Sequence, residues 1–222
     1  MPAIVFDFDG VIVDSEPVHE AALLEAARTL GMSFSHRDYL DELIGYDDRD
    51  FYPALCRLNG RRPTAAEFAS FFAHKKPAVR RALEGGAARP YDGSIALARA
   101  AADRGVPLAI CSGALRDEIE VVLDRLGIAS LFATIVSADE VVRSKPDPEG
   151  YALAASRLGV APSSCVAIED TPTGCKAALA AGLRVIAVGH SLPEDVFPAG
   201  VERFAESSQD LRLDEILEPA RG

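Results

Sequence analysis

The stretch AIVFDFDGVIVDS, residues 3–15, gives the strongest indication of the fold in this sequence. Residues 3–6 form a short apolar run rich in β-branched and aromatic side chains, which is typical of a strand buried on both faces. The run ends in two carboxylates, Asp7 and Asp9, followed by Gly10, which permits a tight turn. Buried carboxylates are costly unless a cation, a proton or hydrogen bonds compensate them. Because ligands bind at the carboxyl ends of strands in open α/β sheets, the stretch predicts a ligand site.

Each acidic motif also has an ordinary structural explanation when it is taken alone. Asp7 and Asp9 could close a solvated turn by accepting hydrogen bonds from local N–H groups. Glu169 and Asp170, which follow another apolar run, could cap the helix predicted to begin at Pro172. Together, however, four carboxylates at one edge of a sheet would repel one another unless a cation lay between them. Oxygen ligands favour a hard ion, so we favour a Mg²⁺ site.

The composition indicates a globular chain with a sizeable core. The sequence has 222 residues, of which 49% are hydrophobic and 26% charged, enough for one large domain or a core with a small insert. Its net charge of -11 argues against a nucleic-acid partner, because non-specific nucleic-acid binding needs a basic surface. A phosphorylated substrate is still compatible with this charge, since a local cation or metal can outweigh the overall field.

The sequence also predicts the cellular compartment of the protein. No apolar run approaches the ~18 residues that cross a bilayer, and no leader pattern follows Met1, so we expect no membrane association. The four cysteines form no CxxC pair and are interpreted as reduced, mostly buried residues of a cytoplasmic protein: Cys56, Cys111, Cys165 and Cys175. We expect a monomer, with a dimer left open.

The pattern of the remaining chain predicts an α/β fold with an insert. Residues 15–85 carry several helical patterns and no convincing strand, whereas from residue 90 strands alternate with helices of about ten residues. We therefore predict a doubly wound, Rossmann-like parallel sheet in residues 1–14 and 86–222, with an inserted helical cap domain. After the first, the predicted strands are 107–111, 133–136, 165–168, 184–188 and an edge strand at 201–204. The predicted helices are 16–30, 35–44, 47–58, 64–83, 94–104, 115–126, 148–158, 172–181 and 211–217.

Two further polar motifs lie between these predicted elements. Ser112 and Gly113 follow the strand predicted at 107–111, at the same sheet edge as the acidic residues. Lys145 lies between two strands in the stiff loop 144–148, Ser-Lys-Pro-Asp-Pro. A lysine in a loop is usually a surface residue. The functional alternative is a cation that neutralises a carboxylate and a phosphate oxygen together.

Taken together, the motifs resemble those of the haloacid dehalogenase superfamily of phosphotransferases. In chain order they are Asp7-Phe8-Asp9-Gly10, Ile110-Cys111-Ser112-Gly113, Lys145-Pro146 and Ile168-Glu169-Asp170-Thr171. Each has the position relative to a predicted strand that the family gives it, and the spacing covers nearly the whole chain. The helical insert after the first motif resembles the small helical cap of that family.

The resemblance implies phosphoryl transfer through a covalent intermediate. Asp7 would attack phosphorus and form an aspartyl-phosphate. Asp9 would protonate the leaving oxygen and then deprotonate the attacking water. Asp7, Asp170 and the backbone carbonyl of Asp9 would hold Mg²⁺, with Glu169 as a direct or water-mediated ligand. An acid at Asp9 favours phosphoryl transfer, because the true dehalogenases and the phosphonate-cleaving members lack one there.

The resemblance also implies how a phosphate group and its substrate would be bound. Ser112 and the N–H of Gly113 would hold phosphate oxygens, and Lys145 would balance their charge. The cap would act as a lid that selects the substrate. Candidate substrate contacts, each of which could instead be a surface residue, are His19, Arg49, Lys76 and Arg116.

Two reactions on a small phosphorylated substrate stay open at this point. The first is hydrolysis of a phosphomonoester such as a sugar phosphate, and the second is isomerisation of a sugar phosphate as in β-phosphoglucomutase. The mutases carry a serine and a lysine just after the serine of the second motif, where this chain has Ala114 and Leu115, so we favour the phosphatase. A non-catalytic binding protein on the same fold is least favoured, because it would have no use for these buried charges.

Overall fold

The computed structural model describes residues 2–43, 48–190 and 192–218. The chain divides into two compact units, an α/β unit of Met1–Ser15 with Arg89–Gly222 and a helical unit of Glu16–Ala88. The two junctions lie close to the boundaries predicted at residues 14 and 85.

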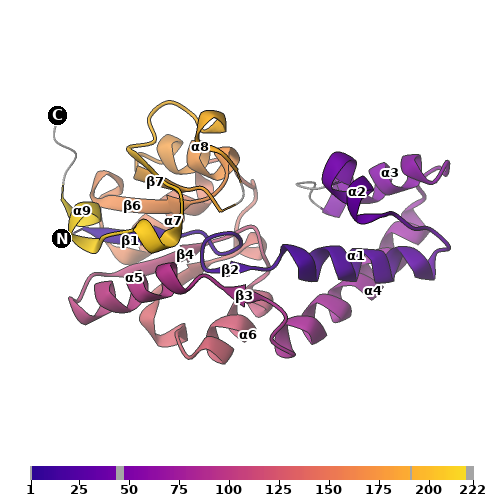
Figure 1. The fold of residues 1–222 in the computed structure, drawn as a ribbon, viewed down its shortest axis with the longest axis horizontal. Helices are drawn as coiled ribbons and strands as arrows, with labels where there is room; N and C mark the ends of the chain where they lie inside the picture. Colours follow the sequence, from indigo (N-terminus) through magenta and orange to yellow (C-terminus); the bar gives the residue numbers. More distant parts are fainter. Residues whose placement is uncertain (1, 44–47, 191, 219–222) are drawn as a thin grey trace. The chain divides into compact units, whose positions relative to one another are not determined.

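The α/β unit is built on a six-stranded sheet with the order β5-β4-β1-β6-β7-β8 (Figure 1). All of its neighbouring strands are parallel, which confirms the predicted fold class. The strands are β1 (Ala3–Phe6), β4 (Leu108–Cys111), β5 (Thr134–Val136), β6 (Cys165–Glu169), β7 (Arg184–Val188) and β8 (Arg203–Ala205). Val5 in β1 pairs with Ala109 on one side and with Ala167 on the other, so the first motif follows the centre of the sheet.

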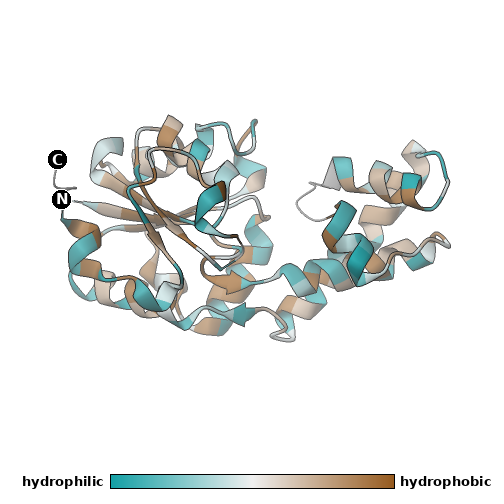
Figure 2. Cartoon of the chain, turned by 45° about the horizontal axis from the view of Figure 1, so that its top comes forward, coloured by the Kyte–Doolittle hydropathy of each residue, from teal (hydrophilic) through white to brown (hydrophobic). Residues whose placement is uncertain are grey.

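Helices cover both faces of this sheet, as the alternating pattern predicted (Figure 1). On one face, α7 (Glu149–Leu158) and α8 (Pro172–Ala180) share a core with Ala3 and Val5 of β1. The other face carries α5 (Asp92–Asp103), α6 (Arg116–Leu126) and α9 (Leu213–Leu217). Brown, apolar strands lie between helices that carry teal, polar surfaces (Figure 2). Short 3₁₀ turns occupy η2 (Ala129–Leu131), η3 (Ala138–Glu140), η4 (Pro162–Ser164), η5 (Glu194–Val196) and η6 (Ser208–Asp210).

The helical unit has a core of aromatic rings. Its elements are α1 (Glu16–Thr29), α2 (His36–Asp38), a π-helical turn η1 (Tyr39–Leu43), α3 (Asp48–Leu58) and α4 (Ala65–Glu84). Helices α1 and α4 pack along each other. The rings that contact one another between these elements are Phe34, Tyr39, Phe51, Tyr52, Phe68, Phe71 and Phe72. Such edge-on and offset contacts stabilise a small helical core beyond the area that they bury.

Three local features differ from the expectations. Over its described residues, the predicted helix 35–44 is a three-residue helix followed by the π-helical turn, in which Tyr39 and Leu43 are both buried. The last strand begins at Arg203, two residues after the predicted start at residue 201. A two-stranded antiparallel ribbon, β2 (Val13–Asp14) with β3 (Arg89–Pro90), was not predicted. Two-residue strands are too short to show an alternating pattern.

The described residues contain no helix that is both long enough and apolar enough to cross a membrane. Each of the four cysteines is buried and free of disulfide bonds, as expected: Cys56, Cys111, Cys165 and Cys175. The cytoplasmic location and the monomeric state stay predictions.

Candidate active site

Asp7 and Lys145, which are distant in sequence, meet at the carboxyl end of β1. The backbone N–H of Asp7 donates to the Ile168 carbonyl at 2.9 Å, which continues the pairing of β1 with β6 by one residue. The Asp7 side chain is 9% exposed, and its Oδ1 accepts a hydrogen bond from Lys145 Nζ at 2.6 Å. The same ammonium donates to Glu169 Oε1 at 2.6 Å. The Lys145 side chain is 19% exposed and is shared by two acids, so it is a largely enclosed cation and not an ordinary surface lysine.

Glu169, the last residue of β6, is fully buried and accepts five hydrogen bonds. Oε1 accepts from Lys145 and from the Tyr151 hydroxyl, the latter at 2.9 Å. Oε2 accepts from the N–H groups of Asp170 and Thr171 and from the Thr171 hydroxyl, each at 3.0 Å. A buried carboxylate with this many donors has its orientation fixed. Glu169 therefore holds the Lys145 ammonium in place beside Asp7.

The donor set at this end of the sheet fits a hard metal ion. Asp7, Glu169 and Asp170 are all buried, and each offers one carboxylate oxygen within 4.8 Å of the others. Oxygen-only ligands of this kind suit Mg²⁺ and similar ions. This cluster of three does not include the Asp9 side chain, whose Oδ1 accepts a hydrogen bond from the Ser15 hydroxyl.

Burial and neighbouring charges shift the pKa values of these groups strongly. Burial raises the pKa of Asp7 well above its ordinary value; Lys145 opposes the rise, and the other carboxylates reinforce it. Burial would lower the pKa of Lys145, but Asp7 and Glu169 outweigh it and raise that pKa, so the ammonium keeps its charge. A divalent cation among the carboxylates would favour the ionised form of Asp7.

Gly10 lets the backbone pass directly beside Asp170. It has φ +81°, and a Cβ on it would lie 1.9 Å from Asp170 Oδ2. Its N–H donates to the Val13 carbonyl at 2.8 Å and closes a turn just after Asp9. The glycine of the first motif is therefore required both by its φ angle and by the lack of space.

The residues of the second motif lie at the end of β4, which is next to β1. The N–H of Ser112 donates to the Val136 carbonyl at 2.9 Å, and its hydroxyl accepts from the N–H of Ala114 at 2.9 Å. Ser112 is buried, whereas Gly113 is exposed and a Cβ on it would meet nothing within 4 Å. Each phosphate-binding candidate thus lies at the same sheet edge as Asp7.

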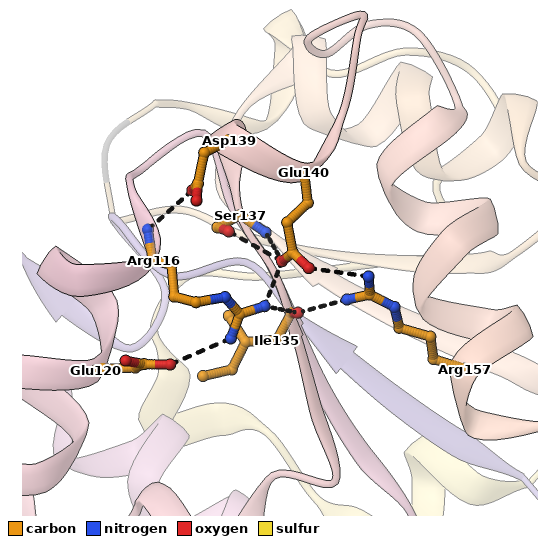
Figure 3. Close-up of polar contacts among 7 residues, drawn as sticks. All are labelled: Arg116, Glu120, Ile135, Ser137, Asp139, Glu140 and Arg157. Atoms are coloured by element: carbon orange, nitrogen blue, oxygen red, sulfur yellow. Dashed lines mark hydrogen bonds and ion pairs between the residues drawn. The ribbon is translucent and has the colours of Figure 1, made fainter.

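Arg116 starts α6 and lies within a network of side chains (Figure 3). Its guanidinium donates to Glu140, to the Ile135 carbonyl at 2.8 Å and to Glu120 at 3.2 Å. Arg157 approaches the other oxygen of Glu140 at 2.9 Å. These contacts tie α6 and α7 to β5 and η3, which gives Arg116 a structural role whatever else it binds.

The Glu140→Gln variant is expected to lose roughly 3 kcal/mol of stability at pH 7, since the pKa of Glu140 falls from 4.5 to about 2. Burial alone would raise that pKa, but hydrogen bonds from two arginines and Ser137 outweigh it. Because the folded pKa is depressed, the stabilisation is present above about pH 4.5 and is lost as the pH falls toward 2. Urea unfolding of variant and wild type between pH 7 and pH 3 measures the difference.

Glu120→Gln is the matched control for this prediction. Glu120 is 51% exposed and bonds the same arginine at 3.2 Å, so its loss is expected to cost less than about 1 kcal/mol. Equal losses in the two variants, or a Glu140→Gln loss that does not shrink in acid, would contradict the assigned role of Glu140.

The cap candidates lie in the helical unit. His19 is a half-buried residue of α1 and Lys76 an exposed residue of α4. Arg49 falls in α3, and its side chain lies outside the described residues. Their contact with a substrate stays a prediction.

Sequence reasoning missed three side chains that order the site. Tyr151 and Thr171 donate to Glu169, and Ser15 donates to Asp9. Tyr151 carries a usable signal, because a tyrosine on a helix otherwise rich in alanine buries its ring only where its hydroxyl finds a partner. Thr171 was recognisable only as a helix cap, a role it also has through its contact with Gly174 N.

Comparison with known proteins identifies the family of this chain. The family model described as haloacid dehalogenase-like hydrolase matches residues 1–182. The chain is 34% identical over 186 residues to Hexitol phosphatase A of Escherichia coli, covering 83% of this chain and 81% of that protein. It is 30% identical over 204 residues to the Phosphorylated carbohydrates phosphatase of Thermotoga maritima, covering 86% of this chain and 87% of that protein.

Solved structures of similar proteins superimpose on this chain. A putative beta-phosphoglucomutase from Thermotoga maritima superimposes with a TM-score of 0.75 and 27% identity, covering 98% of this chain and 97% of that one. The chain spans only 20% of another relative, the chloroplastic Protein SUPPRESSOR OF QUENCHING 1 of Arabidopsis thaliana, to which it is 30% identical. The chain belongs to the haloacid dehalogenase-like hydrolase family. Within the family it is similar to sugar-phosphate phosphatases and to β-phosphoglucomutase-like proteins.

Proposed function

We propose that this chain is a phosphatase that transfers the phosphoryl group of a small phosphomonoester, such as a sugar phosphate, to Asp7 and then to water. The observation that carries the proposal is the buried Asp7 carboxylate, bonded to Lys145 and grouped with two further acids. The similarity to a hexitol phosphatase and to a phosphatase of phosphorylated carbohydrates supports the substrate class.

Named residues of the chain carry each proton transfer of the proposed reaction. An Asp7 oxygen forms the bond to phosphorus while the ester oxygen leaves with a proton from Asp9. Asp9 then takes a proton from water, whose oxygen displaces Asp7 and releases inorganic phosphate. The Ser15 hydroxyl orients Asp9, and the Lys145 ammonium offsets the charge that builds up around Asp7.

We further propose Mg²⁺ as the cofactor, because the donor set is made of carboxylate oxygens. Asp7, Asp170 and the backbone carbonyl of Asp9 would hold it, with Glu169 as a direct or water-mediated ligand. When bound, the ion supplies positive charge that lets a carboxylate approach a phosphate dianion. Ser112 can donate its hydroxyl proton to a phosphate oxygen, since the bond that it receives from Ala114 uses only a lone pair.

A sugar-phosphate mutase is the second candidate, favoured by the likeness to the putative beta-phosphoglucomutase. The two activities share the first half-reaction and differ in what accepts the phosphoryl group. Ala114 and Leu115 stand where the resemblance implies a polar pair for the mutases, so we favour water as the acceptor.

Phosphate release from p-nitrophenyl phosphate and a sugar-phosphate panel, with Mg²⁺ and with EDTA, tests the proposal. We expect turnover that needs the metal, and free phosphate rather than an isomerised sugar phosphate as the product. A parallel assay on β-glucose 1-phosphate separates the mutase. A protein that turns over no ester with Mg²⁺, and does not trap aluminium or beryllium fluoride at Asp7, is not the proposed enzyme.

The Asp9→Asn variant is expected to slow turnover by about 10²- to 10⁴-fold, the usual contribution of a general acid–base. Its affinity for Mg²⁺ should change little, because the backbone carbonyl proposed as the ligand is retained. Single-turnover kinetics and a metal titration followed by calorimetry measure the two effects. A large loss of metal affinity would show that the Asp9 carboxylate is itself a ligand.

A further inference from the structure

His190 forms a bridge between the turn that follows Asp9 and a distant 3₁₀ turn of the α/β unit. Its Nδ1 lies 2.8 Å from the carbonyl oxygen of Gly10, and its Nε2 accepts a hydrogen bond from the N–H of Ser208 at 2.9 Å. Because a backbone N–H can only donate, Nε2 carries the lone pair and Nδ1 carries the proton. The two neighbours therefore select one neutral tautomer, which donates to Gly10.

The His190 ring is held on its face as well as at its edges. The Tyr91 ring stacks on it with centroids 3.8 Å apart and planes 6° apart. The N–H of Tyr91 donates to the Ile12 carbonyl at 2.9 Å, so the stacking partner is itself bonded to the same turn. The ring thus has little freedom to move away from Gly10.

The far end of the bridge is anchored by close packing of η6 on α5. A Cβ on Gly93 would lie 2.4 Å from the backbone carbon and oxygen of Ser208, so the two segments touch through their backbones. Backbone packing therefore holds the N–H of Ser208 in place. The His190 ring links this N–H to the Gly10 carbonyl and so restrains the carbonyl.

The near end of the bridge contacts the turn that follows Asp9, the general acid–base of the proposed reaction. The turn is compact, since the N–H of Ile12 and that of Val13 both donate to the Phe8 carbonyl, at 2.8 and 3.1 Å. The Gly10 carbonyl belongs to the Gly10–Val11 peptide, one residue after Asp9, and the N–H of Gly10 in the preceding peptide donates to the Val13 carbonyl of the same turn. A displacement of the Gly10 carbonyl is therefore expected to shift the Asp9 backbone through the φ and ψ angles of Gly10. A displacement of about 1 Å at a reacting group can cost 10²-fold in rate.

We propose that His190 is a positioning residue for Asp9, and that its Nδ1–H donation to the Gly10 carbonyl is the contact that matters. The proposal rests on the proposed function, in which Asp9 transfers the proton. His190 touches neither substrate nor a reacting atom and acts only through the turn.

Two substitutions separate the two bonds of the ring. His190→Asn places a side-chain N–H near the position of Nδ1 and keeps the bond to Gly10, whereas it cannot reach Ser208. His190→Gln places an amide oxygen near the position of Nε2 and keeps the bond from Ser208, but loses the one to Gly10. Both variants lose the ring that stacks on Tyr91, so they are matched in that respect.

We expect kcat of His190→Gln to fall about 10- to 100-fold with KM little changed, and kcat of His190→Asn to stay within about threefold of wild type. The midpoint temperature of thermal unfolding should fall by similar amounts in the two variants. A role in folding alone predicts equal kcat values that follow stability; that result, or the reverse order, overturns the proposal.

Hydrogen exchange gives a readout that does not need turnover. The amide protons of residues 10–13 should exchange faster in His190→Gln than in His190→Asn, because only the former releases the Gly10 carbonyl. Equal exchange in the two variants contradicts the bridge. If the wild type shows no turnover but the exchange differs as expected, the proposed function fails and the bridge to the turn stands.

Discussion

Replacing Asp7 with asparagine is expected to reduce phosphate release by at least about 10³-fold, because an amide oxygen has neither the charge nor the lone-pair basicity to attack phosphorus. The fold should survive, since the amide oxygen can still accept the hydrogen bond from Lys145 Nζ that Asp7 accepts at 2.6 Å. Initial rates with the best ester of the panel and urea unfolding measure both effects.

Stability sharpens this prediction. Burial raises the pKa of Asp7. In the absence of metal, keeping that carboxylate ionised at neutral pH therefore lowers the free energy of unfolding. The neutral asparagine removes this cost, and metal-free Asp7→Asn should unfold at the same urea concentration as wild type or at a higher one. An inactive variant that is also much less stable would instead indicate a loss of folding.

Asp214→Asn is a suitable control for the loss of a carboxylate. The Asp214 side chain is 75% exposed and pairs with Arg104 on the surface, so the variant should keep both turnover and stability.

If Asp7→Asn released phosphate as fast as wild type, Asp7 would not be the nucleophile, and the covalent mechanism would be wrong.

The Gly174→Ala variant is expected to lose about 1–3 kcal/mol of stability, the usual cost of forcing extra volume into a packed interior. A Cβ at this position in α8 would lie 1.6 Å from Glu169 Oε1. Glu169 cannot turn away without breaking some of its five hydrogen bonds, including that of Lys145. Turnover should therefore fall along with the midpoint of urea unfolding.

Gly113→Ala provides the stability control for this change, because a Cβ on Gly113 would meet no heavy atom within 4 Å. Its unfolding midpoint should match that of wild type. A Gly174→Ala protein with the unfolding midpoint of wild type would show that the Glu169 carboxylate moves easily, and that Lys145 is not held as described.

The central strands were predictable because they are buried on both faces. The apolar runs at β1, β4 and β6 contain residues that are almost all fully buried, so a continuous hydrophobic signal marks them without any alternation. The polar groups that follow were predictable for the related reason that a parallel sheet brings such ends to one edge. The juxtaposition of Asp7 with Asp170 followed from this topology. Lys145 lies in a loop, so its place beside Asp7 came only from the family resemblance.

The contacts that orient the site were not predictable in the same way. His190 is a single histidine whose partner Gly10 is 180 residues away, and no local periodicity encodes such a pair. The sequence indicates that a buried Tyr151 hydroxyl needs a partner, but it does not identify that partner as Glu169. The sequence also shows Arg116 only as a cation near the second motif. Glu120 lies one turn along the same helix, whereas Glu140 lies in the 3₁₀ turn η3, which only the fold brings to Arg116.

The central place of β1 in the sheet has a consequence for synthesis of the chain. Its neighbours are β4 and β6, and the latter ends at Glu169. A nascent chain leaving the ribosome therefore carries the apolar segment Ala3–Phe6 without its second neighbour until more than 160 residues have been translated. During this interval the unpaired edge of β1 is exposed, and unpaired strand edges make incompletely folded chains prone to aggregation. A truncated mRNA that ends before the codons of β6 would encode a chain that has Asp7 but lacks Glu169 and Asp170.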